Sequence, residues 1–303
     1  MKASDLEVLS TESLCESTEH IDEMGTLEAL KAINKEDQRV AEAVRAILPD
    51  IARLVDMASM RMKRGGRIFY IGAGTSGRLG VLDASECPPT YGVDSSLVQG
   101  VIAGGTEALT TSKEGAEDCL EKGANDLRKR GLSEVDVVIG LAASGRTPYV
   151  IGALSFARSI GALTGSISCV SDAGLSEYAD CPIECVTGPE CIMGSTRMKA
   201  GTAQKMILNM ISTELMVKHG KVYRNLMVDV QPTNEKLVAR ACRIVTLASG
   251  CSPERAEALL EETGWDVKTA ICMRVSGKSL QECRESIYAQ EGNVARAIKS
   301  LQE

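Results

Sequence analysis

The feature that most constrains the fold is the segment 67–78, in which an apolar run ends abruptly in glycine, threonine and serine. A short apolar run bounded by glycine predicts a buried strand of a parallel sheet, followed by a tight loop and a helix. Glycines in such a loop, here Gly72, Gly74 and Gly77, let backbone N–H groups approach a bound anion. The segment therefore predicts a phosphate cradle.

The same pattern occurs a second time further along the chain. Residues 135–143 form another short run rich in β-branched side chains, and Ser144, Gly145 and Arg146 follow it. The triplet Ser-Gly-Arg also stands at 76–78, again directly after an expected strand. In an open α/β sheet, ligands lie beyond the carboxyl ends of the strands. We therefore expect the two loops to converge on one ligand.

Apolar runs alternate with helical patterns through the middle of the chain. Further strands are expected at residues 97–103, 163–170 and 183–186. Helices are expected after the first loop as far as Pro88, from a capping box at 111–114, at 148–159, over a long stretch ending near 218–220, and at 228–249. This alternation predicts an α/β fold, a parallel sheet flanked by helices.

The two ends of the chain show helical patterns without strands. We expect an N-terminal helical region at 1–59, a sheet domain at 60–223 and a helical C-terminal region at 224–303. From about residue 250 the pattern predicts a small three-helix piece, with two short helices about a glycine turn at 256–271 and a third at 279–302.

Composition limits the partners. The net charge is −7 and no basic stripe is present, which argues against nucleic acid and anionic membranes. No run reaches the roughly 18 apolar residues of a membrane span, and the first residues lack an apolar signal region, so a cytoplasmic protein is expected. The 11 cysteines are scattered, without a Cys-x-x-Cys pair, and no metal is expected.

The glycine spacing of the first loop also matches the dinucleotide fingerprint. A nicotinamide cofactor would require an acidic residue at the end of the next strand, but that strand ends at Ala103-Gly-Gly-Thr. The hydroxyls of Thr75 and Ser76 suit a terminal phosphate instead. A sugar phosphate is therefore favoured over a dinucleotide.

We expect carboxylates to carry out any proton transfer, because neither of the two histidines stands in a segment expected to form the site. Asp83, Glu86, Glu114 and Glu117 follow the first two strands. Glu86 is expected in the last turn of its helix, where the dipole favours the protonated form, and Glu117 near the start of another, where the opposite holds. Such a pair suits an acid and a base.

Long stretches of the chain resemble the N-acetylmuramic acid 6-phosphate etherase family. The resemblance covers nearly the whole chain and lies in residues 71–91, 114–118, 142–148, 194–205, 225–230 and 233–236. It implies a sugar isomerase (SIS) fold, with the C-terminal piece similar to a ubiquitin-associated (UBA) domain. It also implies a cytoplasmic homodimer of bacterial cell-wall recycling.

The implied reaction splits the D-lactyl ether of N-acetylmuramate 6-phosphate, without a cofactor, into N-acetylglucosamine 6-phosphate and D-lactate. By position, Glu117 would be the base and Glu86 the acid. Ser195, Arg197 or Lys199 is expected to reach the site, with a cation for the lactyl carboxylate. The remaining expected substrate contacts are Gly74, Thr75, Ser76, Glu114, Ser144, Gly145, Arg146 and Thr147.

An alternative of another class is a non-catalytic, sugar-phosphate-sensing regulator of the same fold. The glucokinase regulatory protein shares these motifs but carries two such domains, whereas 303 residues allow for one. Release of D-lactate would distinguish the two functions.

Overall fold

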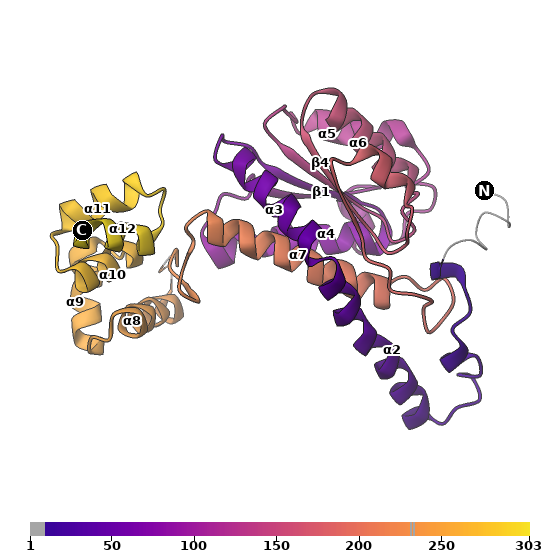
Figure 1. Ribbon diagram of the computed structural model, residues 1–303, viewed down its shortest axis with the longest axis horizontal. Helices are drawn as coiled ribbons and strands as arrows, with labels where there is room; N and C mark the ends of the chain where they lie inside the picture. Colours follow the sequence, from indigo (N-terminus) through magenta and orange to yellow (C-terminus); the bar gives the residue numbers. More distant parts are fainter. Residues whose placement is uncertain (1–9, 231, 233) are drawn as a thin grey trace. The chain divides into compact units, whose positions relative to one another are not determined.

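The computed structural model describes residues 10–230, 232 and 234–303 (Figure 1). Residues 1–9 of the expected N-terminal region, and Thr233 of the segment 233–236, lie outside the described residues. A five-stranded parallel sheet forms the centre and confirms the expected fold class, with strand order β2-β1-β3-β4-β5. The strands are β1 (Ile68–Gly72), β2 (Val98–Ile102), β3 (Val137–Leu141), β4 (Leu163–Ser168) and β5 (Cys181–Glu184).

The strand order places a reversal of direction between β1 and β3. The chain moves outward from β1 to β2 and then returns to β3 on the other side of β1. β1 and β3 pair in parallel, and their last residues, Gly72 and Leu141, are partners in the register. The loops that follow these two strands therefore leave the same edge of the sheet next to each other, at the position where open α/β sheets bind ligands.

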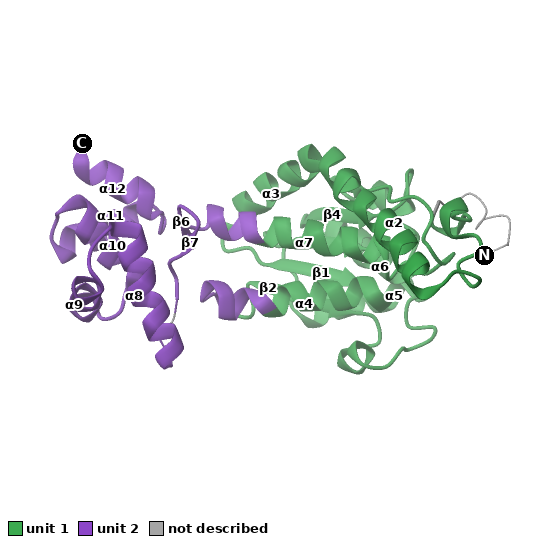
Figure 2. Cartoon of the chain, turned by 90° about the horizontal axis from the view of Figure 1, so that it is seen from below, with its two compact units in different colours: residues 1–85, 95–212 green, residues 86–94, 213–303 purple. Residues whose placement is uncertain are grey.

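Helices cover both faces of the sheet. Gly140 of β3 lies against Val150 and Leu154 on one face, whereas Gly165 of β4 lies against Leu54 on the other. The first face carries α5 (Leu120–Lys129) and α6 (Pro148–Ser159), and the second carries α3 (Leu48–Met62), α4 (Gly74–Tyr91) and α7 (Lys199–Lys218) (Figures 1 and 2). α2 (Thr26–Ala46) and the short helices η1 (Ser10–Glu12), η2 (Glu16–Thr18), η3 (Thr106–Leu109) and η4 (Gly174–Tyr178) complete this part of the chain.

A buried carboxyl joins α4 to α7. Asp83 accepts hydrogen bonds from Asn209 Nδ2 at 2.6 Å and from Ser212 Oγ at 3.0 Å. Burial raises the pKa of Asp83, although these hydrogen bonds oppose the rise. This candidate carboxylate of the sequence is therefore part of the packing between two helices.

The chain divides into two compact units, residues 1–85 with 95–212 and residues 86–94 with 213–303 (Figure 2). In the second unit, N-cap side chains begin α8 to α12, and left-handed glycines such as Gly264 end three of these helices. Its elements are β6 (Val222–Tyr223), β7 (Leu226–Met227), α8 (Glu235–Ser249), α9 (Pro253–Thr263), α10 (Val267–Ser276), α11 (Leu280–Ala289) and α12 (Val294–Gln302). None of the helices in the described ranges is both long and apolar enough to cross a membrane.

Two expectations for the C-terminal region need adjustment. α8 begins at Glu235, later than expected, because the β6–β7 hairpin takes up residues 222–227 and Asn234 caps the helix. Residues 279–302 divide into α11 and α12 because Glu291 and Gly292 both have positive φ. The small three-helix piece expected there is consistent with α9, α10 and this divided third segment.

The helix after the first loop was expected to end before Pro88, and this is wrong. α4 continues through Pro88 and Pro89 to Tyr91. Proline has a φ compatible with a helix, but each ring removes the hydrogen bond to the carbonyl four residues earlier and crowds that carbonyl, so local sequence does not favour this continuation. Gly92, with φ of 61°, then closes the helix by donating to the carbonyl of Pro88 at 2.9 Å. Glu86 is therefore not in the last turn.

The capping box expected at 111–114 is also wrong. Residues 110–119 form a loop, and α5 begins only at Leu120. Gly115 has a φ of 68°, a left-handed conformation that interrupts a helix. Glu114 and Glu117 therefore stand on a loop, and the helix-dipole basis for their contrast with Glu86 does not apply.

α5 and α6 touch backbone to backbone. A Cβ added at Gly123 of α5 would lie 1.9 Å from the carbonyl oxygen of Tyr149, and one at Gly152 of α6 would lie 1.9 Å from that of Leu120. Both positions are too close for any side chain, so the glycines set the distance between the helices.

We expect Gly123→Ala to lower the free energy of unfolding by about 1–3 kcal/mol, because the methyl group forces the two helices apart. Urea unfolding monitored by circular dichroism measures the change. Gly201→Ala is the matched control, since Gly201 also lies within a helix and the atoms nearest to its Cβ position are at 3.5 Å, an ordinary contact. Equal losses in the two variants would contradict the close packing of α5 and α6.

Candidate active site

The first glycine loop is the start of helix α4. The helix begins at Gly74, two residues after β1 ends, so Gly74, Thr75 and Ser76 form its first turn. The N–H groups of a first turn have no carbonyl partner within the helix, and the dipole adds partial positive charge there. Gly74 is exposed, with a φ of 52°. The start of α4 is therefore suited to bind an anion, as expected for the cradle.

The other two glycines of this loop have a different task. A Cβ at Gly72 would lie 2.8 Å from the nitrogen of Gly77, and a Cβ at Gly77 would lie 2.7 Å from the oxygen of Gly72. The two residues are buried against each other, so they let the helix turn sharply back on the strand. Gly72 and Gly77 therefore serve the turn from strand to helix, whereas Gly74 is the exposed glycine at the helix start.

The second loop, Ser144 to Thr147, follows β3 at the same edge. Gly145 has a φ of 67°, and a Cβ there would meet the Cβ of Ala173 at 2.5 Å. Its carbonyl oxygen accepts from Leu175 N at 2.9 Å. These contacts require glycine and fix the loop from behind. Ser144 is half-buried and Arg146 is exposed, while Thr147 precedes the first turn of α6.

A cavity of about 220 Å³ opens beside the start of α4. It brings together Gly74 and the two loop carboxylates Glu114 and Glu117. The backbone of Glu117 is held in place, because its carbonyl oxygen accepts from Tyr149 N at 2.9 Å. The cavity is lined by Ala73, Gly74, Arg78, Ala103, Ala108, Ser112, Lys113, Glu114, Gly115, Ala116 and Glu117. It combines a helix start suited to an anion with two exposed carboxylates.

Two cations of this cavity were missing from the expected contacts. Arg78 donates from Nε to the carbonyl oxygen of Leu109 at 3.0 Å, which holds its side chain at the cavity wall. Lys113 pairs with Glu107 at 2.6 Å. Arg78 is the last residue of the first Ser-Gly-Arg triplet, and this position in the motif could have identified it as a site residue. Lys113 lies in a segment that the sequence pattern predicts as a helix, so nothing in the sequence places it at a cavity.

The other expected site residues lie outside this lining. Ser144, Gly145, Arg146 and Thr147 stand at the end of the adjacent strand, and Glu86 is exposed on the part of α4 that belongs to the second unit. Ser195 is half-buried and Arg197 is exposed, both in the turn before α7. Across the described ranges, no group of three or more His, Cys, Asp and Glu side chains could hold a metal ion.

Lys199, expected as a substrate contact, is buried at the start of α7. Its side chain is 0% exposed, and its Nζ lies 2.9 Å from Glu36 Oε2. Glu190 accepts from the backbone nitrogens of Lys199 and Ala200, each at 2.9 Å. The charge of Lys199 is thus already used in tying α7 to α2, and the geometry gives no support to a substrate contact by this residue.

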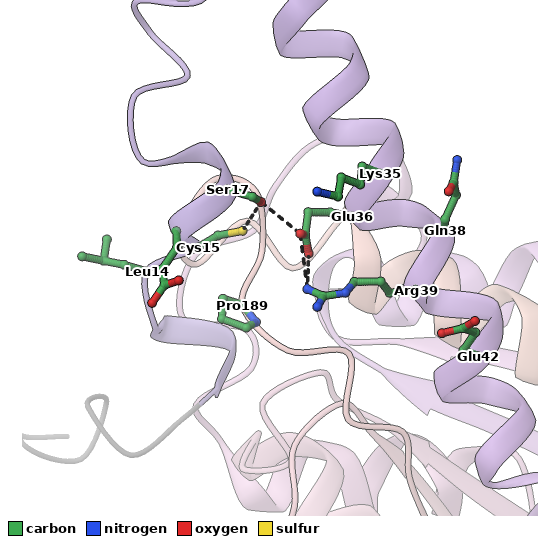
Figure 3. A pocket seen from close by; sticks show the side chains of 10 residues that line it. Leu14, Cys15, Ser17, Lys35, Glu36, Gln38, Arg39, Glu42 and Pro189 are labelled. Carbon is green, nitrogen blue, oxygen red and sulfur yellow. Dashed lines mark hydrogen bonds and ion pairs between the residues drawn. The ribbon is translucent and has the colours of Figure 1, made fainter.

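Glu36 stands at the wall of a second cavity, of about 570 Å³ (Figure 3). Ser17 Oγ donates to Glu36 Oε1 at 2.9 Å, and Arg39 Nη1 lies 3.2 Å from Oε2 (Figure 3). Burial alone would favour the neutral acid, but the hydrogen bonds from Lys199, Ser17 and Arg39 lower the pKa of Glu36 to about 2. The carboxylate is therefore charged at any pH near neutrality.

We expect Glu36→Gln to lower the free energy of unfolding at pH 7 by about 3–5 kcal/mol, because it leaves the Lys199 ammonium buried without a carboxylate. Glu36→Gln combined with Lys199→Met removes both charges and should recover much of this loss. Urea unfolding at pH 7 measures both variants. A single variant as stable as the parent would contradict the ion pair.

The pair also predicts an acid dependence. The folded pKa of Glu36, about 2, lies below its ordinary value of 4.5, so its stabilisation is complete above pH 4.5 and is lost as the pH falls toward 2. Urea unfolding of the double variant, Glu36→Gln with Lys199→Met, should therefore show a smaller fall in the free energy of unfolding between pH 4.5 and 2 than the parent shows.

Comparisons with known proteins identify the family. The family described as the glucokinase regulatory protein N-terminal SIS domain matches residues 50–158. The N-acetylmuramic acid 6-phosphate etherase of Clostridium botulinum (strain Eklund 17B / Type B) is 55% identical over 97% of both chains. That of Clostridium beijerinckii is 53% identical over 99% of both chains.

A solved structure, the putative phosphosugar isomerase from Bacteroides fragilis NCTC 9343, aligns with a TM-score of 0.49 at 17% identity, over 66% of this chain and 95% of that one. The family assignment does not depend on this similarity. It rests on the full-length relatives, which include the etherase of Salmonella paratyphi B at 54% identity over 97% of this chain and 99% of that one. The chain therefore belongs to the N-acetylmuramic acid 6-phosphate etherase family.

Proposed function

We propose that the protein splits the D-lactyl ether of N-acetylmuramate 6-phosphate, giving N-acetylglucosamine 6-phosphate and D-lactate. The observation that carries the proposal is the cavity in which the start of α4 adjoins two carboxylates. An anion site and a base in one cavity suit a phosphorylated substrate that must lose a proton. The name shared by the full-length relatives supports this reaction, and nothing in those relatives favours the regulatory alternative.

The chemistry requires an acid and a base. In the open-chain sugar, the C1 aldehyde acidifies the C2 proton, and the lactyl oxygen on C3 is a β-leaving group. A carboxylate removes the C2 proton while an acid protonates the departing oxygen. Water then adds across the C2–C3 double bond: its hydroxyl goes to C3, its proton goes to the deprotonated acid, and the base returns a proton to C2. Elimination followed by addition of water balances in atoms and electrons without an oxidant or a metal.

The cavity favours Glu117 as the base. Its carboxylate is exposed on the cavity wall, and the hydrogen bond from Tyr149 N fixes its backbone. Glu114 lines the same cavity and is a candidate hydrogen-bond partner of the sugar. Glu86 is proposed as the acid on the family resemblance alone.

The two loops beyond β1 and β3 are proposed to bind the phosphate. Gly74, Thr75 and Ser76 offer N–H groups, and the Ser144 to Thr147 loop lies beside them because the strands are paired. For the lactyl carboxylate we propose Arg197 with Ser195, since Lys199 is committed to Glu36. A homodimer in the cytoplasm is proposed on the same resemblance, and sedimentation of the purified protein tests the dimer.

The phosphate proposal predicts a strong dependence on the 6-phosphate. Purified protein should release D-lactate from N-acetylmuramate 6-phosphate and very little from unphosphorylated N-acetylmuramate. Ser144→Ala should raise KM for the phosphorylated sugar about 10-fold, because one charge-assisted hydrogen bond is lost. A coupled D-lactate assay measures both. Equal turnover of the two sugars would show that no phosphate cradle operates.

The acid–base proposal predicts different defects for the two carboxylates. Glu117→Gln should lose both lactate release and exchange of the C2 hydrogen with deuterated water, because no other group starts the reaction. Glu86→Gln should lose lactate release but retain C2 exchange. Each loss should be on the order of 10²–10⁴-fold, the usual contribution of a positioned acid or base. Proton NMR of the substrate in deuterated water reads both steps.

Asp118→Asn is the matched control, because its exposed carboxylate stands next to Glu117 but is not part of the cavity lining. Exchange retained in Glu117→Gln and lost in Glu86→Gln would reverse the two roles. Full activity in both variants would exclude these residues as the acid and the base.

A further inference from the structure

A buried glutamine of α7 contacts the phosphate loop. Ser76 Oγ donates to Gln204 Oε1 at 2.8 Å, and the two residues are 8% and 1% exposed. The amide nitrogen of the same glutamine, Nε2, is buried and has no hydrogen-bond partner among the residues that the structure describes. An unpaired buried donor is costly, so this amide is only half satisfied in the unliganded chain.

The glutamine stands on a firmly held element. Glu190 caps the start of α7 through the nitrogens of Lys199 and Ala200, and Lys199 is tied to Glu36. Gly201 lies one turn before Gln204 on the same helix face, and its Cβ position is 3.5 Å from Thr75 Cγ2. One face of α7 therefore lies directly against the first turn of α4, where the phosphate is proposed to bind.

The direction of the Ser76 hydroxyl proton decides what this residue can do. A serine hydroxyl has one proton, and in the unliganded chain that proton is donated to Gln204. A phosphate dianion accepts hydrogen bonds and cannot use the lone pairs that remain on Ser76. The hydroxyl can serve the phosphate only if the amide presents its N–H side to Ser76 instead.

We propose that Gln204 is a positioning residue for the phosphate site. When a sugar phosphate binds, the Gln204 amide reverses, Nε2 donates to Ser76 Oγ, and the hydroxyl proton turns to the phosphate. The two ends of an amide have nearly the same shape, so the reversal needs no repacking. The inference rests on the proposed phosphate site, and it names the group that controls one of its donors.

The test measures binding rather than turnover. N-acetylglucosamine 6-phosphate is titrated calorimetrically into the parent, Gln204→Met, Ser76→Ala and the double variant. Gln204→Met should bind about 10-fold more weakly, and the double variant no more weakly than Ser76→Ala, because Gln204 acts through Ser76. Thr202→Ala removes an exposed hydroxyl of α7 that donates to the carbonyl oxygen of Met198, just before the helix, and this variant should bind as the parent does.

A pH profile gives a second readout. Gln204→Glu places a carboxylate that can only accept the Ser76 proton, so its affinity should fall about 100-fold at pH 8. Relative to the parent, that affinity should recover as the pH is lowered and the introduced carboxyl gains a proton to donate. Charge repulsion alone would give the same pH dependence when Gln204→Glu is combined with Ser76→Ala, whereas the proposed action through Ser76 predicts no recovery in that double variant.

The outcomes separate this inference from the proposed function. If the parent protein binds no sugar phosphate, the proposed phosphate site is wrong, and this inference is wrong with it. If the parent binds and Gln204→Met binds with the same affinity, only the role of Gln204 is overturned. The same holds if the losses of the two single variants add up in the double variant. Non-additive losses with a pH-dependent Gln204→Glu establish it.

Discussion

The parallel pairing of β1 with β3 is the constraint on which the site depends. Because these strands lie side by side and end at partnered residues, their two glycine loops must leave the sheet together. The buried contact between Gly72 and Gly77 then turns α4 back so that its first N–H groups face the same edge. On the opposite side of α4, the buried charges around Lys199 fix the start of α7 against this turn. Backbone N–H groups thus come together at the edge where we propose that the phosphate binds.

Most of the sheet was predictable from local sequence. The central strands β1 and β3 are short apolar runs that are buried at every position, and burial on both faces makes such runs conspicuous. Both wrong helix predictions concern residues that disfavour a helix. α4 continues through Pro88 and Pro89 although proline removes hydrogen bonds inside a helix, and Gly115 adopts a left-handed conformation despite the capping pattern before it.

The parts of the candidate site that come from backbone loops could be predicted from the sequence. The parts that come from contacts between side chains distant in sequence could not. The two glycine loops and the carboxylates Glu114 and Glu117 after β2 were candidates from the sequence, and Gly74, Glu114 and Glu117 do share one cavity. The burial of Lys199 depends on Glu36, which lies 163 positions away in sequence, and no local pattern reveals such a contact. The same holds for Gln204, whose meaning comes only from its contact with Ser76.

The most direct test of the account is a crystal structure of the protein with N-acetylglucosamine 6-phosphate bound. The account predicts the phosphate within hydrogen-bond distance of the first N–H groups of α4 and of the Ser144 loop, with the sugar directed toward Glu117. A phosphate found elsewhere, for example in the cavity beside Glu36 and Arg39, would contradict the assignment of the strand ends as the substrate site.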